Sequence, residues 1–341
     1  MKILFLQLKR IGDLILTTPA VAALRESFPD AQLTIAVSNE CADLLSAIPD
    51  VDRTLIARRT PRDLALLFSI TASRFDWCID FTGNDRAAFL ALLSRARRRV
   101  VSYRVREQSK MRARAYTDFV RVRMRDVHTV DYNLALLEPL GIQTPGSRAP
   151  DLQLPQVVRE EAEALRRDWK ITRPYVILHP GSARREKLWE PGRWAEVISH
   201  FGRNKDIDLV LTSGPSPDEQ RHVAAVKNKL QQQIIDLSGK TNLLALAALV
   251  SQARLLVTVD SAPMHLAAGT RTPQVVLFGP TNPFHWRPRE STALILQGKS
   301  ATPVTEFSLA QPRFVMSEIS TEAVISAMDS LLSLRAAAQS S

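Results

Sequence analysis

The chain has 341 residues, of which 45% are hydrophobic and 23% charged, and its formal net charge is +10. This composition excludes a disordered chain, a collagen-like repeat and a small disulfide scaffold. At about 150 residues per domain, the length favours two domains. The two cysteines, Cys41 and Cys78, form no Cys-x-x-Cys pair, which indicates a reducing compartment.

Short apolar strands alternate with amphipathic helical stretches in the first half of the chain. The predicted strands span residues 2–8, 32–37 and 77–81, and the predicted helices span 20–28 and 41–47. This alternation is typical of a parallel α/β sheet. The apolar run at the N-terminus is too short for a signal peptide, and no run is long enough to span a membrane. We therefore expect a cytoplasmic protein.

The positive charge is concentrated in one segment. Residues 95–125 contain twelve basic and two acidic residues, so this segment alone carries a net +10. The interspersed valines and aromatic residues indicate a folded segment. Such a patch favours an anionic partner, namely a nucleic acid, an anionic membrane surface or a phosphorylated substrate, and a solvated charged face is the alternative. Few aromatic residues are available for base stacking, which disfavours nucleic acid.

A turn-rich stretch at residues 144–155 divides the chain, and the alternation then starts again. Predicted strands span 175–179, 207–212, 234–237, 255–259 and 274–278, and predicted helices span 157–169, 193–201, 218–230, 243–251 and 320–334, with another from about 263. We expect one doubly wound domain at residues 1–155 and a second at 156–341. Ligands bind beyond the carboxyl ends of the strands in such domains.

The first strand leads into Lys9-Arg10-Ile11-Gly12-Asp13. Gly12 permits a tight turn, and the Asp13 carboxylate at this edge can accept a proton from a hydroxyl group. The alternative is that Asp13 caps a helix. No Walker loop or Gly-x-Gly-x-x-Gly fingerprint is present, which disfavours NTP hydrolysis and NAD binding.

In the second half, the turn His179-Pro180-Gly181-Ser182 is followed by Lys187, a cation of the kind that binds phosphate oxygens. An ordinary surface lysine is the alternative.

The run 257–265 is a stronger signal for a binding site than the Lys187 turn. A buried strand ends at Asp260, and a helix starts with Pro263 near its first turn. The free backbone amides at the start of this helix can bind a diphosphate, and the Asp260 carboxylate can accept hydrogen bonds from sugar hydroxyls. An ordinary capped helix with His265 in the core is the alternative.

Two Asp-x-Asp triplets, Asp50/Asp52 and Asp206/Asp208, precede strands and are interpreted as solvated turns. The six histidines show no ligand spacing. The sequence therefore predicts no metal site.

Together, the three turns resemble the heptosyltransferases of glycosyltransferase family nine, which build the inner core of lipopolysaccharide. The segments that carry the resemblance are 9–13 with Thr17-Thr18-Pro19-Ala20, 179–182 with Lys187-Leu188-Trp189, Ser238-Gly239-Lys240-Thr241, and 259–265 with Phe278-Gly279-Pro280-Thr281. The Ser-Ala-Pro-Met-His run and Trp286-Arg287-Pro288 are most similar to the branch that adds the third heptose.

The resemblance implies a GT-B fold of two facing Rossmann-like domains with a cleft between them, the first binding the acceptor and the second ADP-heptose. It implies that Asp13 is the catalytic base. The implied donor-binding residues are Ser182, Lys187, Glu219, Asp260, Ser261, Ala262, His265 and Thr281, with Asp218 as an alternative to Glu219. The expected acceptor-binding residues are Lys9, Arg10, Arg97, Arg98 and Arg104.

The expected activity is metal-independent, inverting transfer of a heptose to the lipopolysaccharide core, with no cofactor. The basic segment would then bind the phosphorylated acceptor and the anionic cytoplasmic face of the inner membrane. Two alternatives are a GT-B transferase for another nucleotide sugar and a non-catalytic lipid-binding relic. The presence of Asp13, Lys187 and Asp260 disfavours the relic.

Overall fold

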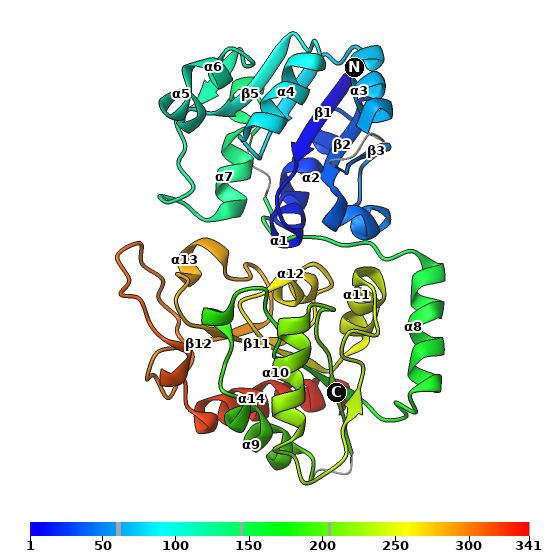
Figure 1. The fold of residues 1–341 in the computed structure, drawn as a ribbon, viewed down its shortest axis with the longest axis vertical. Helices are drawn as coiled ribbons and strands as arrows, with labels where there is room; N and C mark the ends of the chain where they lie inside the picture. The colour runs from blue at the N-terminus through cyan, green and yellow to red at the C-terminus, as the bar shows by residue number, and fades with distance from the viewer. Residues whose placement is uncertain (59–62, 144–145, 204–205, 341) are drawn as a thin grey trace. The chain divides into compact units, whose positions relative to one another are not determined.

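The computed structural model describes residues 1–58, 63–143, 146–203 and 206–340. The chain divides into two compact units, Met1–Gln153 and Leu154–Ser341. Each unit has its own six-stranded parallel sheet (Figure 1). The predicted linker includes residues 144–145, which lie outside the described residues, and residues 146–155 contain no helix or strand.

The sheet of the first unit has the strand order β3-β2-β1-β4-β5-β6. Its strands are β1 (Lys2–Gln7), β2 (Gln32–Ser38), β3 (Arg53–Ala57), β4 (Trp77–Asp80), β5 (Arg98–Ser102) and β6 (Asp118–Val120). The helices are α1 (Ile11–Ile15), α2 (Thr18–Ser27), α3 (Asp63–Ser73), α4 (Asp85–Leu93), α5 (Arg104–Gln108), α6 (Lys110–Ala113) and α7 (Thr129–Ala135), with 3₁₀ helices η1 (Asn39–Ala47) and η2 (Glu138–Leu140).

The second unit repeats this topology with the strand order β12-β11-β10-β7-β8-β9. Its strands are β7 (Tyr175–His179), β8 (Asp208–Leu211), β9 (Ile235–Asp236), β10 (Leu255–Val259), β11 (Gln274–Phe278) and β12 (Ala293–Gln297). The helices are α8 (Gln156–Asp168), α9 (Pro191–Phe201), α10 (Pro217–Lys227), α11 (Leu243–Gln252), α12 (Ala262–Gly269), α13 (Pro283–Trp286) and α14 (Thr321–Ser340), with η3 (Arg185–Lys187) and η4 (Met316–Glu318).

In both sheets the strand order reverses next to the first strand, where β1 lies beside β4 and β7 lies beside β10. The register pairs Leu6 with Asp80 and His179 with Thr258, so the two strands of each pair end at the same edge. Connections leave these neighbouring strands in opposite directions, and the crevice so formed is where open α/β sheets bind ligands. The turns selected from the sequence follow these strands.

Side-chain caps start several of the helices. The Asn84 carboxamide oxygen accepts a hydrogen bond from the Ala87 amide at the start of α4. Ser216 caps α10 and Asn242 caps α11 in the same way. These caps satisfy amides that lack a partner within the helix and fix where each helix begins.

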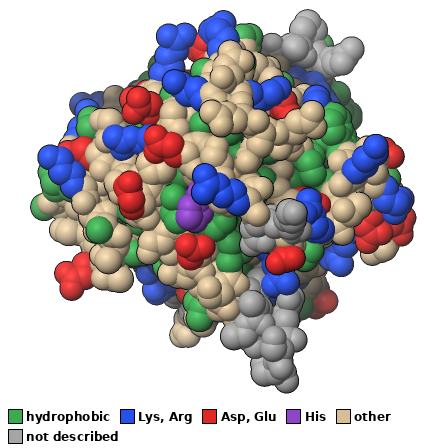
Figure 2. All heavy atoms as spheres, turned by 90° about the horizontal axis from the view of Figure 1, so that it is seen from below, with side chains coloured by type: hydrophobic (Ala, Val, Ile, Leu, Met, Phe, Trp, Pro, Cys, Tyr) green, Lys and Arg blue, Asp and Glu red, His purple; other side chains and the backbone are tan. Residues whose placement is uncertain are grey.

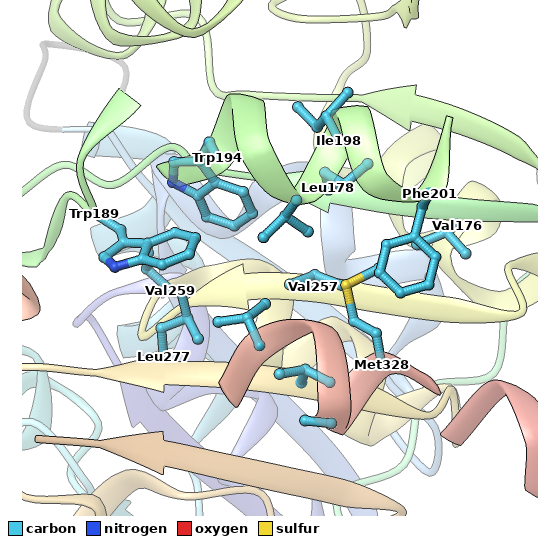
Figure 3. Close-up of a cluster of buried hydrophobic side chains, with 14 of the residues drawn as sticks. Val176, Leu178, Trp189, Trp194, Ile198, Phe201, Val257, Val259, Leu277 and Met328 are labelled. Atoms are coloured by element: carbon cyan, nitrogen blue, oxygen red, sulfur yellow. The ribbon is translucent and has the colours of Figure 1, made fainter. Parts of the chain in front are cut away.

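The core of the second unit is built around two tryptophans (Figure 3). Trp189 and Trp194 are both fully buried, and their rings meet edge to face with centroids 5.3 Å apart. The indole N–H of Trp189 donates to the carbonyl of Ile319 at 3.1 Å, which joins the segment between η3 and α9 to the segment before α14. Both tryptophans are therefore packing residues of this core.

Strands made of continuous apolar runs have their predicted bounds, as β7, β10 and β11 show. The helix predicted at 41–47 is the 3₁₀ helix η1, and the last helix continues from its predicted end at 334 to Ser340. Gly12 lies inside α1 and has no positive φ, so it does not form the expected tight turn.

The interpretation of Asp208 as part of a solvated turn is wrong. Asp208 is the first residue of β8 and is buried. Its carboxylate accepts hydrogen bonds from the amides of Thr172 and Arg173, at 3.0 and 2.9 Å, and pairs with the Arg173 guanidinium at 2.6 Å. The carboxylate therefore fastens the chain that enters β7.

Within the part of the chain that the structure describes, no helix has both the length and the apolar character needed to cross a bilayer. The face shown in Figure 2 carries basic and acidic side chains that are interspersed, without a region of one sign.

Replacing Trp194 with alanine should lower the free energy of unfolding by about 3–5 kcal/mol, because it opens a cavity in a core that cannot collapse fully. Chemical denaturation followed by circular dichroism measures this change. Val157→Ala, at an exposed position of α8, is the control and should change stability by less than about 0.5 kcal/mol. Equal effects of the two substitutions would contradict this description of the core.

Candidate functional site

The candidate site of the first unit lies in the turn between β1 and α1. The strand ends at Gln7, and the helix begins at Ile11 with Arg10 as its N-cap residue. Asp13 is the third residue of α1, so it is not the N-cap. The helix is short and has no side-chain cap, so other contacts must hold it in place.

A buried polar network fixes the backbone beneath Asp13. The Thr17 hydroxyl donates to the Asp13 carbonyl at 2.7 Å, and the Gln7 carboxamide donates to the Thr17 hydroxyl oxygen at 2.8 Å. From α7, the Asn133 carboxamide donates to the Leu16 carbonyl at 2.9 Å. The side chains of Gln7, Thr17 and Asn133 are buried. Because hydrogen bonds of this kind are strong in a low dielectric, the network fixes the orientation of α1.

The environment of Asp13 favours a carboxyl group that titrates above its usual range. Burial raises its pKa, and the charge of Lys9 opposes that rise, as do the Arg10 amide and charge. For Lys9, burial lowers the pKa, while the negative charges of Asp13 and Asp80 raise it. The Lys9 ammonium also lies 5.7 Å from the centre of the Tyr132 ring. Lys9 and Asp13 therefore form an electrostatically coupled pair.

Asp80, at the end of β4, is a residue of this site that the sequence analysis missed. Its buried carboxylate accepts hydrogen bonds from the amides of Thr82 and Gly83, at 2.7 and 3.0 Å, and from the Tyr116 hydroxyl at 2.5 Å. Burial raises its pKa, against these hydrogen bonds and the charge of Lys9. A signal was available, because an apolar strand ends here at Asp80 and the turn Phe81-Thr82-Gly83 follows, much as Asp260 and Ser261 follow β10.

The five basic residues expected to bind an acceptor do not share one location. Arg104 follows the carboxyl end of β5, and its charge acts on Lys9. Arg97 and Arg98 lie at the opposite end, because Arg98 begins β5 and pairs in register with Trp77, the first residue of β4. The Arg98 guanidinium forms an ion pair with Asp118 at 2.6 Å. Lys9, Arg10 and Arg104 therefore remain near Asp13, whereas Arg97 and Arg98 do not.

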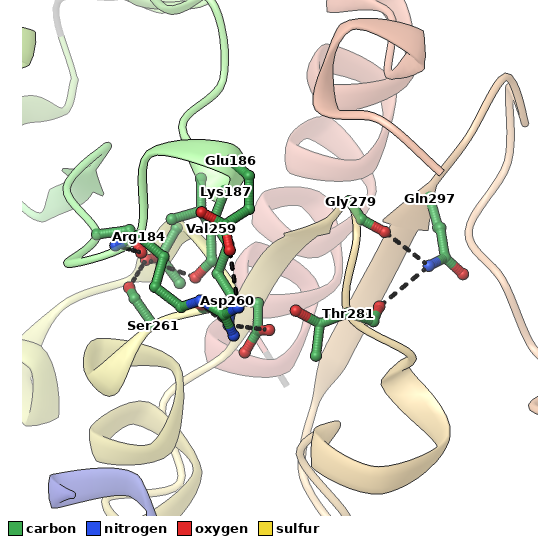
Figure 4. A network of polar contacts seen from close by, with 11 residues as sticks. Arg184, Glu186, Lys187, Val259, Asp260, Ser261, Gly279, Thr281 and Gln297 are labelled. Carbon is green, nitrogen blue, oxygen red and sulfur yellow. Dashed lines mark hydrogen bonds and ion pairs between the residues drawn. The ribbon is translucent and has the colours of Figure 1, made fainter. Parts of the chain in front are cut away.

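The candidate site of the second unit is built around Lys187 and Asp260 (Figure 4). Lys187 ends η3 next to the buried anchor Trp189, and Asp260 follows β10. The Lys187 ammonium donates to the Asp260 carboxylate at 2.6 Å and to its carbonyl at 3.2 Å. Their side chains are only 13% and 7% exposed. Two predicted site residues that are far apart in the sequence are thus joined by a largely buried ion pair.

Helix α12 starts directly after this pair. Its N-cap residue, Ser261, makes no capping hydrogen bond with its side chain, and the Ser261 hydroxyl lies 3.3 Å from that of Thr258. Ala262 is the first helical residue, so the positive end of the helix is next to Lys187 and Asp260. His265 is buried in the same helix, and burial lowers its pKa to about 4, which leaves the imidazole neutral at pH 7.

The structure separates the two candidates for an acidic donor-site residue. Glu219 is buried against the turn after β7, so that a Cβ atom on Gly181 would come within 2.6 Å of its Oε1. Its other oxygen accepts a hydrogen bond from the Ser216 hydroxyl at 2.8 Å. Asp218 instead faces solvent and pairs with Arg185 and Arg221. Glu219 is therefore the residue at the site edge of the sheet.

Two further predicted residues line the same edge. Ser182 is buried, and its hydroxyl accepts a hydrogen bond from the Arg184 amide at 3.3 Å. Thr281 lies in the loop after β11, where the Gln297 carboxamide donates to the carbonyls of Gly279 and Thr281, at 3.4 and 3.3 Å (Figure 4). The loop is thereby tied to β12.

These arrangements define two complementary chemistries. A carboxylate with a raised pKa beside a lysine can accept a proton from a hydroxyl group. A lysine beside a helix N-terminus can hold a diphosphate, and the adjacent carboxylate can accept hydrogen bonds from sugar hydroxyls. Among the residues that the structure describes, no group of three or more His, Cys, Asp or Glu side chains is arranged to hold a metal ion.

Comparison with known proteins matches residues 64–309 to the family described as glycosyltransferase family 9 (heptosyltransferase). Lipopolysaccharide heptosyltransferase 3 of Escherichia coli K12 is 29% identical over 94% of this chain and 95% of the relative. The glycosyl transferase family 9 structure from Veillonella parvula has a TM-score of 0.83 at 25% identity and covers 97% of both chains. The E. coli heptosyltransferase WaaC solved with ADP has a TM-score of 0.70 at 19% identity, with 97% of both chains covered.

Replacing Lys9 with methionine should raise the pKa of the Asp13 carboxyl group further, because it removes the positive charge that opposes the effect of burial. Carbon-13 NMR titration of the labelled carboxyl group measures this pKa. Lys110→Met, at an exposed position of α6, is the matched control and should leave it unchanged. An Asp13 pKa that is the same in the Lys9 variant and the wild type would contradict the coupling.

Proposed function

This chain belongs to glycosyltransferase family 9, the heptosyltransferases, and we propose that it transfers a heptose from ADP-heptose to the inner core of lipopolysaccharide. The family and the GT-B fold class predicted from the sequence are both confirmed. The name of the E. coli relative, lipopolysaccharide heptosyltransferase 3, supports the acceptor and the branch that adds the third heptose. WaaC structures with ADP and with ADP-2-deoxy-2-fluoro heptose support the donor.

The second unit is the donor-binding unit in this proposal. The observation that carries it is the Lys187–Asp260 pair at the start of α12, because a cation, a helix N-terminus and a carboxylate match the diphosphate and the hydroxyl groups of a nucleotide sugar. Lys187 and the amides near Ser261 and Ala262 stabilise the negative charge that grows on the departing ADP. Ser182, Glu219, His265 and Thr281 line the rest of the donor site.

The first unit binds the acceptor and supplies the base. The Asp13 carboxylate takes the proton of the acceptor hydroxyl as that oxygen attacks the anomeric carbon from the face opposite ADP, and the anomeric configuration is inverted. A carboxyl group whose pKa is raised by burial is a stronger base than an exposed aspartate. The charge of Lys9 opposes this rise and so favours the ionised form of Asp13, and the Gln7–Thr17–Asn133 network holds α1 in position.

The basic residues near Asp13 bind acidic groups of the acceptor. Lys9, Arg10 and Arg104 are the residues that we assign to this role, since Arg97 and Arg98 lie at the other end of β5. The other basic residues of segment 95–125 hold the enzyme at the anionic cytoplasmic face of the inner membrane, where a lipid-linked acceptor is found. A basic residue near such a surface contributes about 1 kcal/mol, so a few suffice for weak docking.

The reaction is tested by incubating the purified protein with truncated core acceptors and a panel of sugar nucleotides, and by measuring product mass and linkage. We expect one heptose to be added from ADP-heptose, with ADP released and with the same rate in the presence of EDTA. Transfer only from another sugar nucleotide would identify a different donor. The absence of ADP release with every acceptor would contradict an enzymatic function, and loss of transfer in EDTA would contradict metal independence.

Replacing Asp13 with asparagine should lower kcat by a factor of about 100 to 10,000, the range that general-base catalysis contributes. The affinity for ADP should stay nearly the same, because the donor binds to the other unit. Steady-state kinetics and calorimetric titration with ADP measure the two effects. Asp43→Asn, an exposed position in η1, is the control. Wild-type turnover in the Asp13 variant would show that another group is the base.

A further inference from the structure

Three helices of the first unit expose large apolar side chains. The exposed fractions are 71% for Leu64 and 75% for Phe68 on α3, 51% for Phe89 and 53% for Leu92 on α4, and 79% for Met111 on α6. These are half of the ten large hydrophobic side chains that are exposed in the described part of the chain. We call the surface that these five residues form the apolar surface.

The five side chains belong to one region, because α3 contacts α4 and α4 contacts α6 (Figure 1). Leu64 and Phe68 are four residues apart and Phe89 and Leu92 are three apart, so each pair lies on one side of its helix. The inward sides of the same helices carry buried residues such as Leu66, Ile70 and Leu90. Both sides of α3 and α4 are therefore apolar, whereas a helix at a protein–water boundary normally has a polar outer side.

Ion pairs hold α3, α4 and α6 together, and the basic residues that remain unpaired give this region a positive charge. Asp63 of α3 pairs with Arg86 of α4 at 2.5 Å, and Asp85 of α4 pairs with Arg112 of α6 at 2.8 Å. The acidic residues of the three helices are thus neutralised. Four more basic residues are exposed and, among the described residues, none of them forms an ion pair: Arg74 after α3, Arg95 after α4, and Lys110 and Arg114 at the ends of α6.

We propose that the apolar surface inserts into an anionic phospholipid bilayer, with Arg74, Arg95, Lys110 and Arg114 binding the lipid headgroups. Exposed aromatic and aliphatic side chains rimmed by cations are the combination that binds a membrane interface. A second copy of this chain is a poorer partner, because it would bring four unpaired cations against the same four cations. The choice of a bilayer rests on the proposed function, which places the acceptor in a membrane.

This proposal differs from docking by charge alone, because apolar insertion persists where salt screens charges. At about 0.5 M salt the Debye length is only a few ångströms, so the interaction of exposed arginines with headgroups is largely lost. Burial of Leu64 and Phe68 in the acyl region is not weakened by salt. Binding should therefore have one component that depends on Arg95 and Arg114 and another that depends on Leu64 and Phe68.

The test measures binding to vesicles of phosphatidylglycerol and phosphatidylethanolamine, by sedimentation, at 0.1 and 0.5 M salt. Leu64→Ser/Phe68→Ser should weaken binding about tenfold or more at both salt concentrations, as expected for the loss of two buried apolar side chains. Arg95→Gln/Arg114→Gln should weaken binding mainly at 0.1 M salt. Val157→Ser/Leu309→Ser replaces two exposed apolar side chains of the second unit and is the matched control, with no change expected.

A second measurement reports insertion directly. In Phe68→Trp, the new indole fluorescence should be quenched by vesicles that contain brominated acyl chains, and the wild type provides the background from the five native tryptophans. Wild-type binding by the Leu64/Phe68 variant, or no additional quenching in Phe68→Trp, would overturn the proposal. So would sedimentation velocity that shows a wild-type dimer converted to a monomer by the Leu64/Phe68 variant, since the apolar surface would then join two copies.

Heptose transfer to a delipidated, water-soluble core acceptor separates this proposal from the proposed function. The Leu64/Phe68 variant should keep wild-type turnover with that acceptor, because neither side chain belongs to the assigned sites. If the wild type transfers no heptose, the proposed function fails, while the vesicle and quenching results still decide whether the apolar surface inserts. If the Leu64/Phe68 variant loses turnover with the soluble acceptor, the assignment of this surface to membrane binding alone is overturned.

Discussion

The structure of each unit depends on one constraint, namely that two neighbouring parallel strands end at the same edge while their connections leave in opposite directions. β1 and β4 meet this condition in the first unit, and β7 and β10 meet it in the second. No connection covers the ends of such strands, so backbone amides and polar side chains there face a crevice. Lys9, Asp13 and Asp80 are gathered in this way, as are Ser182, Lys187 and Asp260.

Burial then determines what these groups can do. In the first unit, a partly buried carboxylate and a partly buried lysine act on each other, and neighbouring amides and the Tyr116 hydroxyl stabilise the second carboxylate, Asp80. In the second unit, the Lys187–Asp260 pair is largely buried beside an uncapped helix N-terminus. The same fold thus gathers a coupled carboxylate and lysine in one unit and an ion pair beside a helix N-terminus in the other.

The strands that consist of one continuous apolar run could be predicted from the sequence alone. β7, β10 and β11 are continuous apolar runs and were predicted with their bounds, whereas β5 starts with Arg98-Arg99 and β3 is partly exposed, so neither has a clear strand pattern. An apolar strand that ends at Asp80 was visible in the sequence, but the place of this residue beside Lys9 follows from the pairing of β4 with β1, which is a long-range contact. Arg98 and Arg104 are close in sequence, but they lie at opposite ends of β5, because a strand rises by about 3.3 Å per residue. The Lys187–Asp260 contact joins residues 73 positions apart.

The ion pair between Lys187 and Asp260 also bears on which small molecules the proposed donor site would bind. An anion without hydrogen-bond donors, such as sulfate, that drew the Lys187 ammonium group away would leave the Asp260 carboxylate unpaired in a place shielded from water, at a cost of several kcal/mol. A sugar nucleotide offers negative oxygens to the lysine and hydroxyl donors to the aspartate together. At the proposed donor site, this ion pair would therefore disfavour simple inorganic anions and favour ligands that satisfy both partners.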